Sequence, residues 1–328
     1  MPAVSVIIPN YNHAHFLQQR IDSVLQQTYN DFEVIIMDDC STDNSKEIIE
    51  RYRGNAFVTN IIYNEINSGS TFKQWQKGIN LANGAYIWIA ESDDWCEPTL
   101  LQELINGTAN NPDIAISYCG SVVINERDEI LYTSTSKKMG EVTDGISFIK
   151  KNLLESNVIF NASMAIFNKL SFQNISLEFT SYKFCGDWLF WIMLSQKGSV
   201  YTSGKYLNYF RKHDRDVSRR SMADGTYFVE YPKLAKYLLD NNLITNEQYG
   251  YLLYKKYRPL KKFEGNKQIK KDLLFTYTKL IGIKNLVKFS VTTIVHGVYI
   301  NLWIVTPLFI KNVIRKILLS KNKSVNIH

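Results

Sequence analysis

The sequence AYIWIAESDD, residues 85–94, joins a run of apolar and aromatic residues directly to an acidic turn. Three earlier segments have the same form: residues 4–12 read VSVIIPNYN, residues 33–43 read EVIIMDDCSTD, and residues 58–69 read VTNIIYNEINSG. Each begins with a short run rich in β-branched residues, which is typical of a strand buried in a sheet. The four segments therefore predict four strands, each of which ends in polar residues.

Between these predicted strands, apolar residues recur at helical spacing. Helices are expected at residues 16–28, 46–52 and 72–82, and a further helix from Pro98 leads to a strand at residues 114–118. Strands that alternate with helices through short connections predict an α/β fold, with a mostly parallel sheet flanked by helices. Ligands of such sheets bind beyond the carboxyl ends of the strands.

Later segments follow a looser pattern. Residues 122–125 and 130–133 predict a hairpin, residues 158–167 another sheet element, and residues 187–195 (DWLFWIMLS) a short buried helix. From about Gly225 onward the segments are helical and grow steadily more basic. We therefore expect an α/β domain over residues 1–225 and a basic helical C-terminal region over residues 226–328.

The composition is that of an ordinary globular protein. Of the 328 residues, 45% are hydrophobic and 21% charged, which excludes wholesale disorder and collagen-like structure. The mean hydropathy of −0.19 excludes a polytopic membrane protein. Four cysteines stand far apart without metal-binding spacing, and no secretory leader is recognisable, so we expect reduced thiols in a cytoplasmic protein.

Charge divides unevenly along the chain. The net charge is +7, but residues 241–328 hold sixteen Lys or Arg against three acids, a net of +13, which leaves −6 for residues 1–240. Carboxylates that follow the second and fourth strands would gather at one edge of the sheet, where they repel one another unless a cation lies among them. This edge therefore predicts a metal site.

The sequence lacks two common phosphate-binding loops. No G-x-x-x-x-G-K-[ST] is present, which excludes a P-loop, and PNYNHA rather than a glycine-rich turn follows the first strand. A sheet of this kind without either loop would handle phosphates through a bound cation.

Residues 4–12, 33–43, 67–94 (NSGSTFKQWQKGINLANGAYIWIAESDD) and 185–188 (CGDW) form four blocks in a fixed order. In order and spacing these blocks resemble the inverting family 2 glycosyltransferases with the GT-A fold. The resemblance covers roughly residues 3–220. It implies a hexosyltransferase that takes its sugar from a nucleoside diphosphate sugar, with UDP favoured as the nucleotide.

The resemblance also implies which residues bind the donor nucleotide: Pro9, Tyr11, Asp39, Ser41, Glu91 and Ser92. A carboxylate such as Asp39 suits the donor edge of a base such as uracil. The alternative is that residues 39–43 form only an Asx turn and a helix N-cap. We expect both, with Asp43 mostly structural and Asp39 mostly functional.

Glu91-Ser92-Asp93-Asp94 stands where the family has its D-x-D motif. Asp93 is the implied ligand of Mn²⁺ or Mg²⁺, an ion that bridges the two phosphates and stabilises the leaving diphosphate. Glu91 departs from the commoner Asp, and its longer side chain can reach a ribose hydroxyl or a metal-bound water. The alternative is a solvated acidic loop.

Asp187, between Gly186 and Trp188, matches the catalytic base of the family. Inversion needs one carboxylate opposite the leaving group, to take the proton of the attacking hydroxyl. Many relatives have an acid before the base, but Cys185 and Gly186 stand there instead. The alternative is that Asp187 caps the helix that follows, a role compatible with catalysis.

Residues 209–218 (YFRKHDRDVS) look like the late loop that folds over the donor diphosphate in the family. His213, Arg215 and Ser218 are the implied contacts to phosphate or metal, since cations and hydroxyls stabilise the leaving anion. The alternative is an exposed basic loop without a ligand.

The basic C-terminal region favours a membrane surface. No RNA- or DNA-binding motif accompanies its cations, so we expect no nucleic acid partner. Residues 289–310 hold no Lys, Arg, Asp or Glu and are long enough to span a bilayer. Polar residues and Pro307 within this stretch, and five cations after it, argue against a span. We favour helices on the anionic inner face of the cell membrane, with a buried helical core as the alternative.

These features together predict a metal-dependent, cytoplasmic enzyme that is peripheral on the membrane. By analogy with the family, its acceptor would be a saccharide or lipid-linked saccharide in cell-surface polysaccharide or glycolipid assembly. The alternatives are a nucleotide-sugar-binding protein without catalysis, against which Asp93 and Asp187 argue, and a membrane scaffold.

Overall fold

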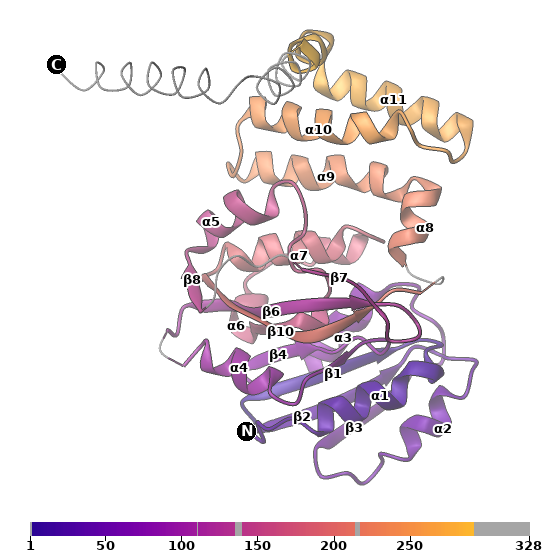
Figure 1. Ribbon diagram of the computed structural model, residues 1–328, viewed down its shortest axis with the longest axis vertical. Coiled ribbons are helices and arrows are strands. Elements are labelled where there is room, and N and C mark those ends of the chain that lie inside the picture. Colours follow the sequence, from indigo (N-terminus) through magenta and orange to yellow (C-terminus); the bar gives the residue numbers. More distant parts are fainter. Residues whose placement is uncertain (1, 110, 135–139, 214–216, 292–328) are drawn as a thin grey trace, which may run out of the picture. The chain divides into compact units, whose positions relative to one another are not determined.

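The computed structural model describes residues 2–109, 111–134, 140–213 and 217–291 (Figure 1). The chain divides into two compact units, Met1–Leu243 and Ile244–His328. The first unit contains the sheet and the helices as far as α9 (Thr226–Asp240), so it extends past residue 225. The second contains α10 (Asn246–Leu260) and α11 (Lys267–Ile281).

Among the described residues, ten strands form one mixed sheet in the first unit. The main path runs β3-β2-β1-β4-β9-β6-β10-β5, with β7 beside β6 and β8 beside β10. The pairs β1/β2, β1/β4, β2/β3 and β6/β10 are parallel, whereas β9 lies antiparallel between β4 and β6. The strands are β1 (Val4–Asn10), β2 (Phe32–Asp38), β3 (Val58–Tyr63), β4 (Tyr86–Ile89), β5 (Trp95–Cys96), β6 (Ile114–Ile124), β7 (Ile130–Thr133), β8 (Glu141–Thr143), β9 (Ala165–Asn168) and β10 (Ser199–Arg211).

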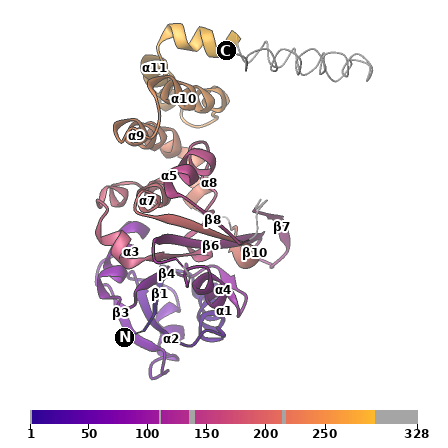
Figure 2. The ribbon, with the colours of Figure 1, turned by 90° about the vertical axis from the view of Figure 1, so that its left-hand side faces the viewer.

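Helices cover both faces of the sheet. α1, α2 and α4 lie on one side, and α3 and α7 on the other (Figure 2). Gln27, just after α1, joins two elements of the first side, since its side chain accepts from the backbone N–H of Leu101 on α4. The helices of this unit before α9 are α1 (Ala14–Leu25), α2 (Ser45–Glu50), α3 (Thr71–Leu81), α4 (Leu100–Asn106), α5 (Gly145–Phe148), α6 (Lys169–Gln173), α7 (Gly186–Ser195) and α8 (Val217–Asp224).

The core is densest around α7, the helix predicted at residues 187–195. Every residue of α7 except Asp187 is buried. Phe190 lies at its centre, with ring centroids 4.9 Å from Phe179 and 5.1 Å from Phe167, both edge-on or tilted. Aromatic pairs at these separations contribute beyond the area that they bury. The buried helix thus fixes the position of Asp187 at its amino end.

The predicted α/β class, with a largely parallel sheet flanked by helices, is confirmed. β3 has the predicted bounds, and the predicted hairpin exists as β6 and β7, although β6 runs on from residue 114 to Ile124 as one strand. Residues 199–211 had no predicted element but form β10. Gly204 in its middle has φ 77°, and register shifts break the pairing with β6, so no regular alternation marks this strand.

The described part of the second unit, residues 244–291, is helical, as predicted. Thr245 and Gln248 form a capping box at the start of α10, and Asn266 accepts backbone hydrogen bonds at the start of α11. Residues 283–291 continue as a helix. No described helix is both long and apolar enough to cross a membrane, and of the stretch 289–310 only residues 289–291 are described.

Candidate active site

A cavity of about 420 Å³ opens at the carboxyl edge of the sheet, where the strand order predicts a ligand. Five of the six residues predicted to bind the donor nucleotide line it: Pro9, Tyr11, Asp39, Glu91 and Ser92. Further lining residues, which the sequence did not single out, come from the start of α3, from the loop before α7 and from α8 and α9: Asn67, Gly69, Ser70, Thr71, Gln74, Lys183, Arg220, Ser221, Asp224 and Thr226.

Ser41, the sixth predicted residue, ties two loops of this edge together. Its hydroxyl accepts from the backbone N–H of Asn12 at 2.9 Å and from the side chain of Asn10 at 3.2 Å. Asn12 (φ 55°) and Cys40 (φ 62°) both lie in the left-handed region, so each loop turns sharply beside Ser41. Asp43 is structural as expected, since its carboxylate accepts from the backbone N–H groups of Ala14 and Ser45.

Asp39 is held by several donors. Its carboxylate accepts from the side chain of Asn64 at 2.6 Å, from Gln74 at 3.0 Å, and from both the backbone N–H and the hydroxyl of Ser68. These bonds tie the end of β2 to the loop before α3, so Asp39 has a structural role besides any contact to a base. Recognition of the base by Asp39 stays a prediction.

Glu91, at the end of β4, lies between the cavity and the core. Its carboxylate accepts from the indole Nε1 of Trp75 at 2.7 Å. Burial, together with the charge of Asp93, raises the pKa of Glu91 to about 8, and the Trp75 bond only partly opposes this rise. A carboxyl with this pKa is largely protonated at neutral pH and can donate a hydrogen bond to a ligand.

His13, Asp93 and His213 form the cluster best suited to a metal ion among the described residues. One ligand atom from each lies within 4.8 Å of the others. Nε2 of His213 is 3.0 Å from Oδ2 of Asp93, and Nδ1 of His13 is 2.8 Å from the hydroxyl of Ser92. Burial opposes ionisation of Asp93, but the hydrogen bond from His213 and the two imidazoles outweigh it and lower the pKa of Asp93. The cluster therefore offers a charged carboxylate beside two imidazoles.

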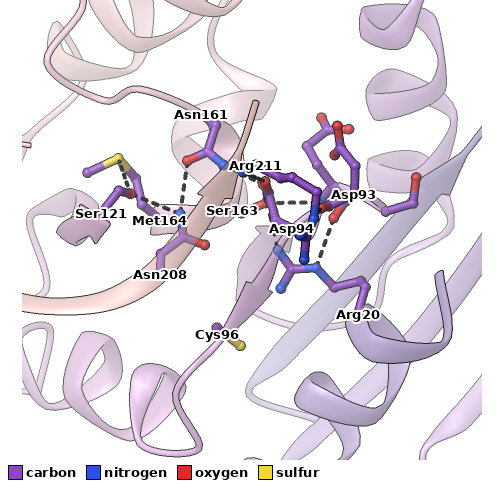
Figure 3. A network of polar contacts seen from close by, with 12 residues as sticks. Arg20, Asp93, Asp94, Cys96, Ser121, Asn161, Ser163, Met164, Asn208 and Arg211 are labelled. Carbon is purple, nitrogen blue, oxygen red and sulfur yellow. Dashed lines mark hydrogen bonds and ion pairs between the residues drawn. The ribbon is translucent and has the colours of Figure 1, made fainter. Parts of the chain in front are cut away.

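Two buried arginines hold the backbone of this acidic segment (Figure 3). Nε of Arg20 donates to the carbonyl of Glu91 at 2.8 Å, and Nε of Arg211 donates to the carbonyl of Asp93 at 2.9 Å. Arg20 is fully buried and Arg211 almost so. Because Arg211 lies on β10 two residues before His213, it brings the late loop to the end of β4.

Asp94 is the buried anchor of the same network. It accepts from the backbone N–H of Arg211 at 3.0 Å, from the hydroxyl of Ser163 at 2.6 Å and from the side-chain amide of Asn161 (Figure 3). Nη2 of Arg20 lies 3.7 Å from its carboxylate. Burial raises the pKa of Asp94, and the charge of Asp93 adds to the rise. Asp94 therefore stabilises the fold of the site, whereas Asp93 beside it belongs to the cluster with His13 and His213.

Asp187 is the second residue of α7 and is half-buried. Cys185 occupies the N-cap position, so Asp187 is not the cap that the alternative interpretation expected. Its carboxylate accepts from Asn157 at 2.9 Å and from the backbone N–H of Trp188 at 2.7 Å. Burial raises the pKa of Asp187 to about 7 against both bonds. This value suits a group that accepts a proton near neutral pH.

Glu230 on α9 supports the loop that leads to Asp187. Its buried carboxylate accepts from the backbone N–H groups of Lys183 at 2.6 Å, Phe184 at 2.9 Å and Cys185 at 2.8 Å. Carboxylates at a helix start are stabilised by such N–H groups. No role for Glu230 was predicted, although an acid among the apolar residues 227–231 (YFVEY) is a usable signal of a buried partner.

The late loop is placed only in part. His213 joins Asp93, as described above; Arg215 lies outside the described residues, and so does the side chain of Ser218. Arg220 and Ser221 of α8 line the cavity a few residues further on. Trp95, which follows the acidic segment, stacks on Tyr209 with centroids 3.6 Å apart.

Comparison with known proteins identifies the family of this chain. The family model for glycosyl transferase family 2 matches residues 5–175, more than half of the chain. The chain belongs to glycosyl transferase family 2. The resemblance predicted a family 2 glycosyltransferase with the GT-A fold, and both the family and the fold are confirmed.

Two bacterial relatives align with this family 2 glycosyltransferase over two thirds or more of both chains. Poly(ribitol-phosphate) beta-N-acetylglucosaminyltransferase TarP of Staphylococcus aureus is 27% identical over 267 residues, 78% of each chain. The uncharacterized glycosyltransferase RT0329 of Rickettsia typhi is 28% identical over 224 residues, 67% of each chain. Both relatives carry the name of a glycosyltransferase.

Solved structures of TarS from S. aureus share the fold. One covers 87% of this chain and 50% of its own at a TM-score of 0.64 and 17% identity. Another, residues 1–349 of TarS in complex with UDP-GlcNAc, covers 85% of this chain and 72% of its own at a TM-score of 0.55 and 18% identity. At these identities the likeness establishes the GT-A fold alone.

Proposed function

We propose that this glycosyltransferase moves a hexose-type sugar, with inversion, from a UDP-sugar to a saccharide or lipid-linked saccharide acceptor. The product would belong to a cell-surface polysaccharide or glycolipid. The observation that carries the proposal is the cavity at the carboxyl edge of the sheet, which has the His13–Asp93–His213 cluster beside it. The complexes of TarS with UDP and with UDP-GlcNAc support a uridine nucleotide as donor.

The cavity has the chemistry that a nucleoside diphosphate sugar requires. Tyr11 keeps 46% of its surface exposed at the cavity wall, where its ring can stack on a base. Lys183 and Arg220 contribute two cations from different elements, which suits the charge of a diphosphate. Glu91 and Asp39 offer polar oxygens on the opposite, strand side for a ribose and a base.

A divalent ion fits the donor set of His13, Asp93 and His213, and its two imidazoles favour Mn²⁺ over Mg²⁺, which prefers oxygen ligands. One carboxylate and two imidazoles leave coordination positions for diphosphate oxygens and water. When bound, the ion would supply positive charge to the leaving diphosphate. The protein's own part is to hold Asp93 ionised through His213 and to fix the Asp93 backbone through Arg211.

Asp187 is the proposed base. Its carboxylate would accept the proton of the acceptor hydroxyl as that oxygen attacks the anomeric carbon and the diphosphate leaves from the opposite face. Asn157 and the Trp188 backbone N–H orient the carboxylate, and Glu230 fixes the loop before it. No acid is needed for the leaving group, because the diphosphate departs as a charged species.

The direct test is a donor screen with and without a chelator. We expect UDP-sugars to raise the thermal midpoint more than GDP- or dTDP-sugars, and UDP release to require Mn²⁺ or Mg²⁺. EDTA should abolish the release, and added metal should restore it. Full release in EDTA would contradict the metal site. Binding of a donor without turnover over a range of saccharide acceptors would favour the alternative of a non-catalytic nucleotide-sugar-binding protein.

We also propose a cytoplasmic location, peripheral on the inner face of the cell membrane. The nucleotide sugar is supplied in the cytoplasm, and a lipid-linked acceptor is presented at the membrane. The net charge of +13 over residues 241–328 supports an anionic lipid surface over neutral partners.

A further inference from the structure

The second unit has a pocket lined by cations and tyrosines. It has a volume of about 380 Å³, and its described lining residues are Tyr251, Tyr254, Lys255, Arg258, Pro259 and Lys262. None of these is acidic. Lys255, Arg258 and Lys262 recur at helical spacing, so they share one face of α10 and its C-terminal end. We call these three cations with the tyrosines the cationic pocket.

Three cations on one helix face disfavour the folded unit unless an anion approaches them. Like charges one helical turn apart are destabilising. The ammonium of Lys255 lies 5.5 Å from the ring centre of Tyr251. Because the ring attracts the cation, this contact keeps the charge at the pocket. The pocket is therefore arranged for a compact anion such as a phosphate group.

An apolar stripe runs along the helix of residues 283–291. It consists of Ile283, Val287 and Val291, spaced four residues apart, with 74%, 59% and 53% of their surfaces exposed. Phe275 on α11 adds another exposed ring at 72%. Single exposed apolar residues are ordinary, but a regular stripe of large ones is typical of an interaction surface.

Phe289 joins the stripe to the cationic pocket. Its ring centre lies 5.6 Å from the rings of both Tyr251 and Tyr254, which line the pocket, and it is itself buried. This packing turns one face of the 283–291 helix toward α10 and leaves the stripe on another. The 283–291 helix therefore packs beside the pocket through Phe289, and the stripe lies on its exposed face.

We propose that this unit docks on an anionic phospholipid surface, with lipid phosphates in the cationic pocket and the apolar stripe at the acyl boundary. Charge decides the occupant: residues 244–291 carry eleven Lys or Arg against three acids. Apolar residues beside cations are the pattern of helices that lie in a membrane interface. This inference deepens the proposed location, and it is independent of the sugar that the enzyme transfers.

The test is flotation of the full-length protein with vesicles. We expect binding to vesicles that contain phosphatidylglycerol, little binding to pure phosphatidylcholine, and weaker binding as salt rises. The triple variant Lys255→Glu, Arg258→Glu, Lys262→Glu should weaken binding on the order of 100-fold, since each cation near an anionic surface strengthens binding by about fivefold. Ile283→Asn with Val287→Asn should weaken binding to the same vesicles without changing its salt dependence.

The matched control reverses three exposed lysines of the first unit, with Lys150→Glu, Lys151→Glu and Lys233→Glu. We expect it to bind vesicles like the unaltered protein, and release of UDP in solution should be the same in all variants, which shows that they fold. Equal loss in the control would mean that net charge alone acts and would overturn the pocket. Absent binding to anionic vesicles, or a dimer in solution that the stripe variant dissociates, would overturn the proposal.

Discussion

The carboxylate of Glu230 accepts a hydrogen bond from the backbone N–H of Cys185 at 2.8 Å, two residues before Asp187. Two more N–H groups of the same loop donate to it, and Tyr231 beside it packs on Trp188, with centroids 5.6 Å apart. Helix α9 thus holds the start of α7 from outside the sheet. The catalytic unit therefore includes α9, although the sequence led us to place residues from 226 onward in the basic C-terminal region.

Replacing Glu230 tests this support. Glu230→Gln keeps the shape but offers one acceptor oxygen to three N–H groups, so at least one buried donor loses its partner. We expect kcat to fall roughly tenfold, the equivalent of about 1.4 kcal/mol. The KM for the donor should change little. Asp240→Asn, an exposed acid of the same helix, is the control; equal effects of the two changes would contradict a specific role for Glu230.

The pH dependence of transfer should report Asp187. Burial raises the pKa of Asp187 to about 7, and a base must be ionised, so kcat should fall as pH drops below about 7. Asn157→Ala removes a hydrogen bond that stabilises the ionised form, so the acid limb should move to higher pH. Glu230→Gln removes a negative charge that raises this pKa, so the limb should move to lower pH. Shifts in the same direction would argue against Asp187 as the titrating group.

The buried network beneath the acidic segment predicts a stability effect. Asp94→Ala leaves Arg20 without its buried counter-charge and removes the acceptor for Ser163 and the Arg211 backbone. We expect the free energy of unfolding to fall by about 3–5 kcal/mol, the usual cost of breaking a buried pair from one side. Urea unfolding monitored by tryptophan fluorescence measures this.

The control for that experiment is an exposed ion pair. Arg53 bonds Glu50 at the surface just after α2, where solvent screens the charges, and Arg53→Ala should leave the urea midpoint almost unchanged. If Asp94→Ala unfolds at the same urea concentration as Arg53→Ala, the network does not anchor the site.

The affinity for Mn²⁺ should depend on His13 and not on its neighbour His15. His13→Ala removes one donor of the cluster with Asp93 and His213, and we expect the dissociation constant for Mn²⁺ to rise at least about tenfold. His15 is exposed and lies outside the cluster, so His15→Ala should bind Mn²⁺ as before. Isothermal titration measures binding without the reaction. Unchanged affinity in His13→Ala would restrict the site to the other two residues.

Local sequence patterns predicted the elements that a regular run of apolar residues marks. Val58–Tyr63 has the predicted bounds, and the strand ends at Asn10, Asp39 and Glu91 meet at one edge because parallel strands bring them together. β10 was missed since its pairing depends on bulges around Gly204 that no regular alternation reveals. Long-range packing, rather than local propensity, decides such strands.

The candidate site residues that belong to sequence motifs could be named from the sequence. Asp93 and Asp187 stand in recognisable blocks, but their supports do not. Arg20 lies on an amphipathic helix where a cation normally faces water, and Glu230 bonds backbone groups 45 to 47 residues away. Backbone N–H groups carry no sequence signature, so only the folded chain identifies such partners.

If Asp187 is the base of a sugar-transfer reaction, its replacement should stop transfer and spare nucleotide binding. Single-turnover transfer from a UDP-sugar is compared for the unaltered protein and Asp187→Asn, with UDP affinity measured in parallel. We predict a loss of transfer on the order of 10³-fold with UDP affinity preserved, since the base acts on the acceptor and not on the nucleotide. Transfer by Asp187→Asn at the unaltered rate would contradict the account.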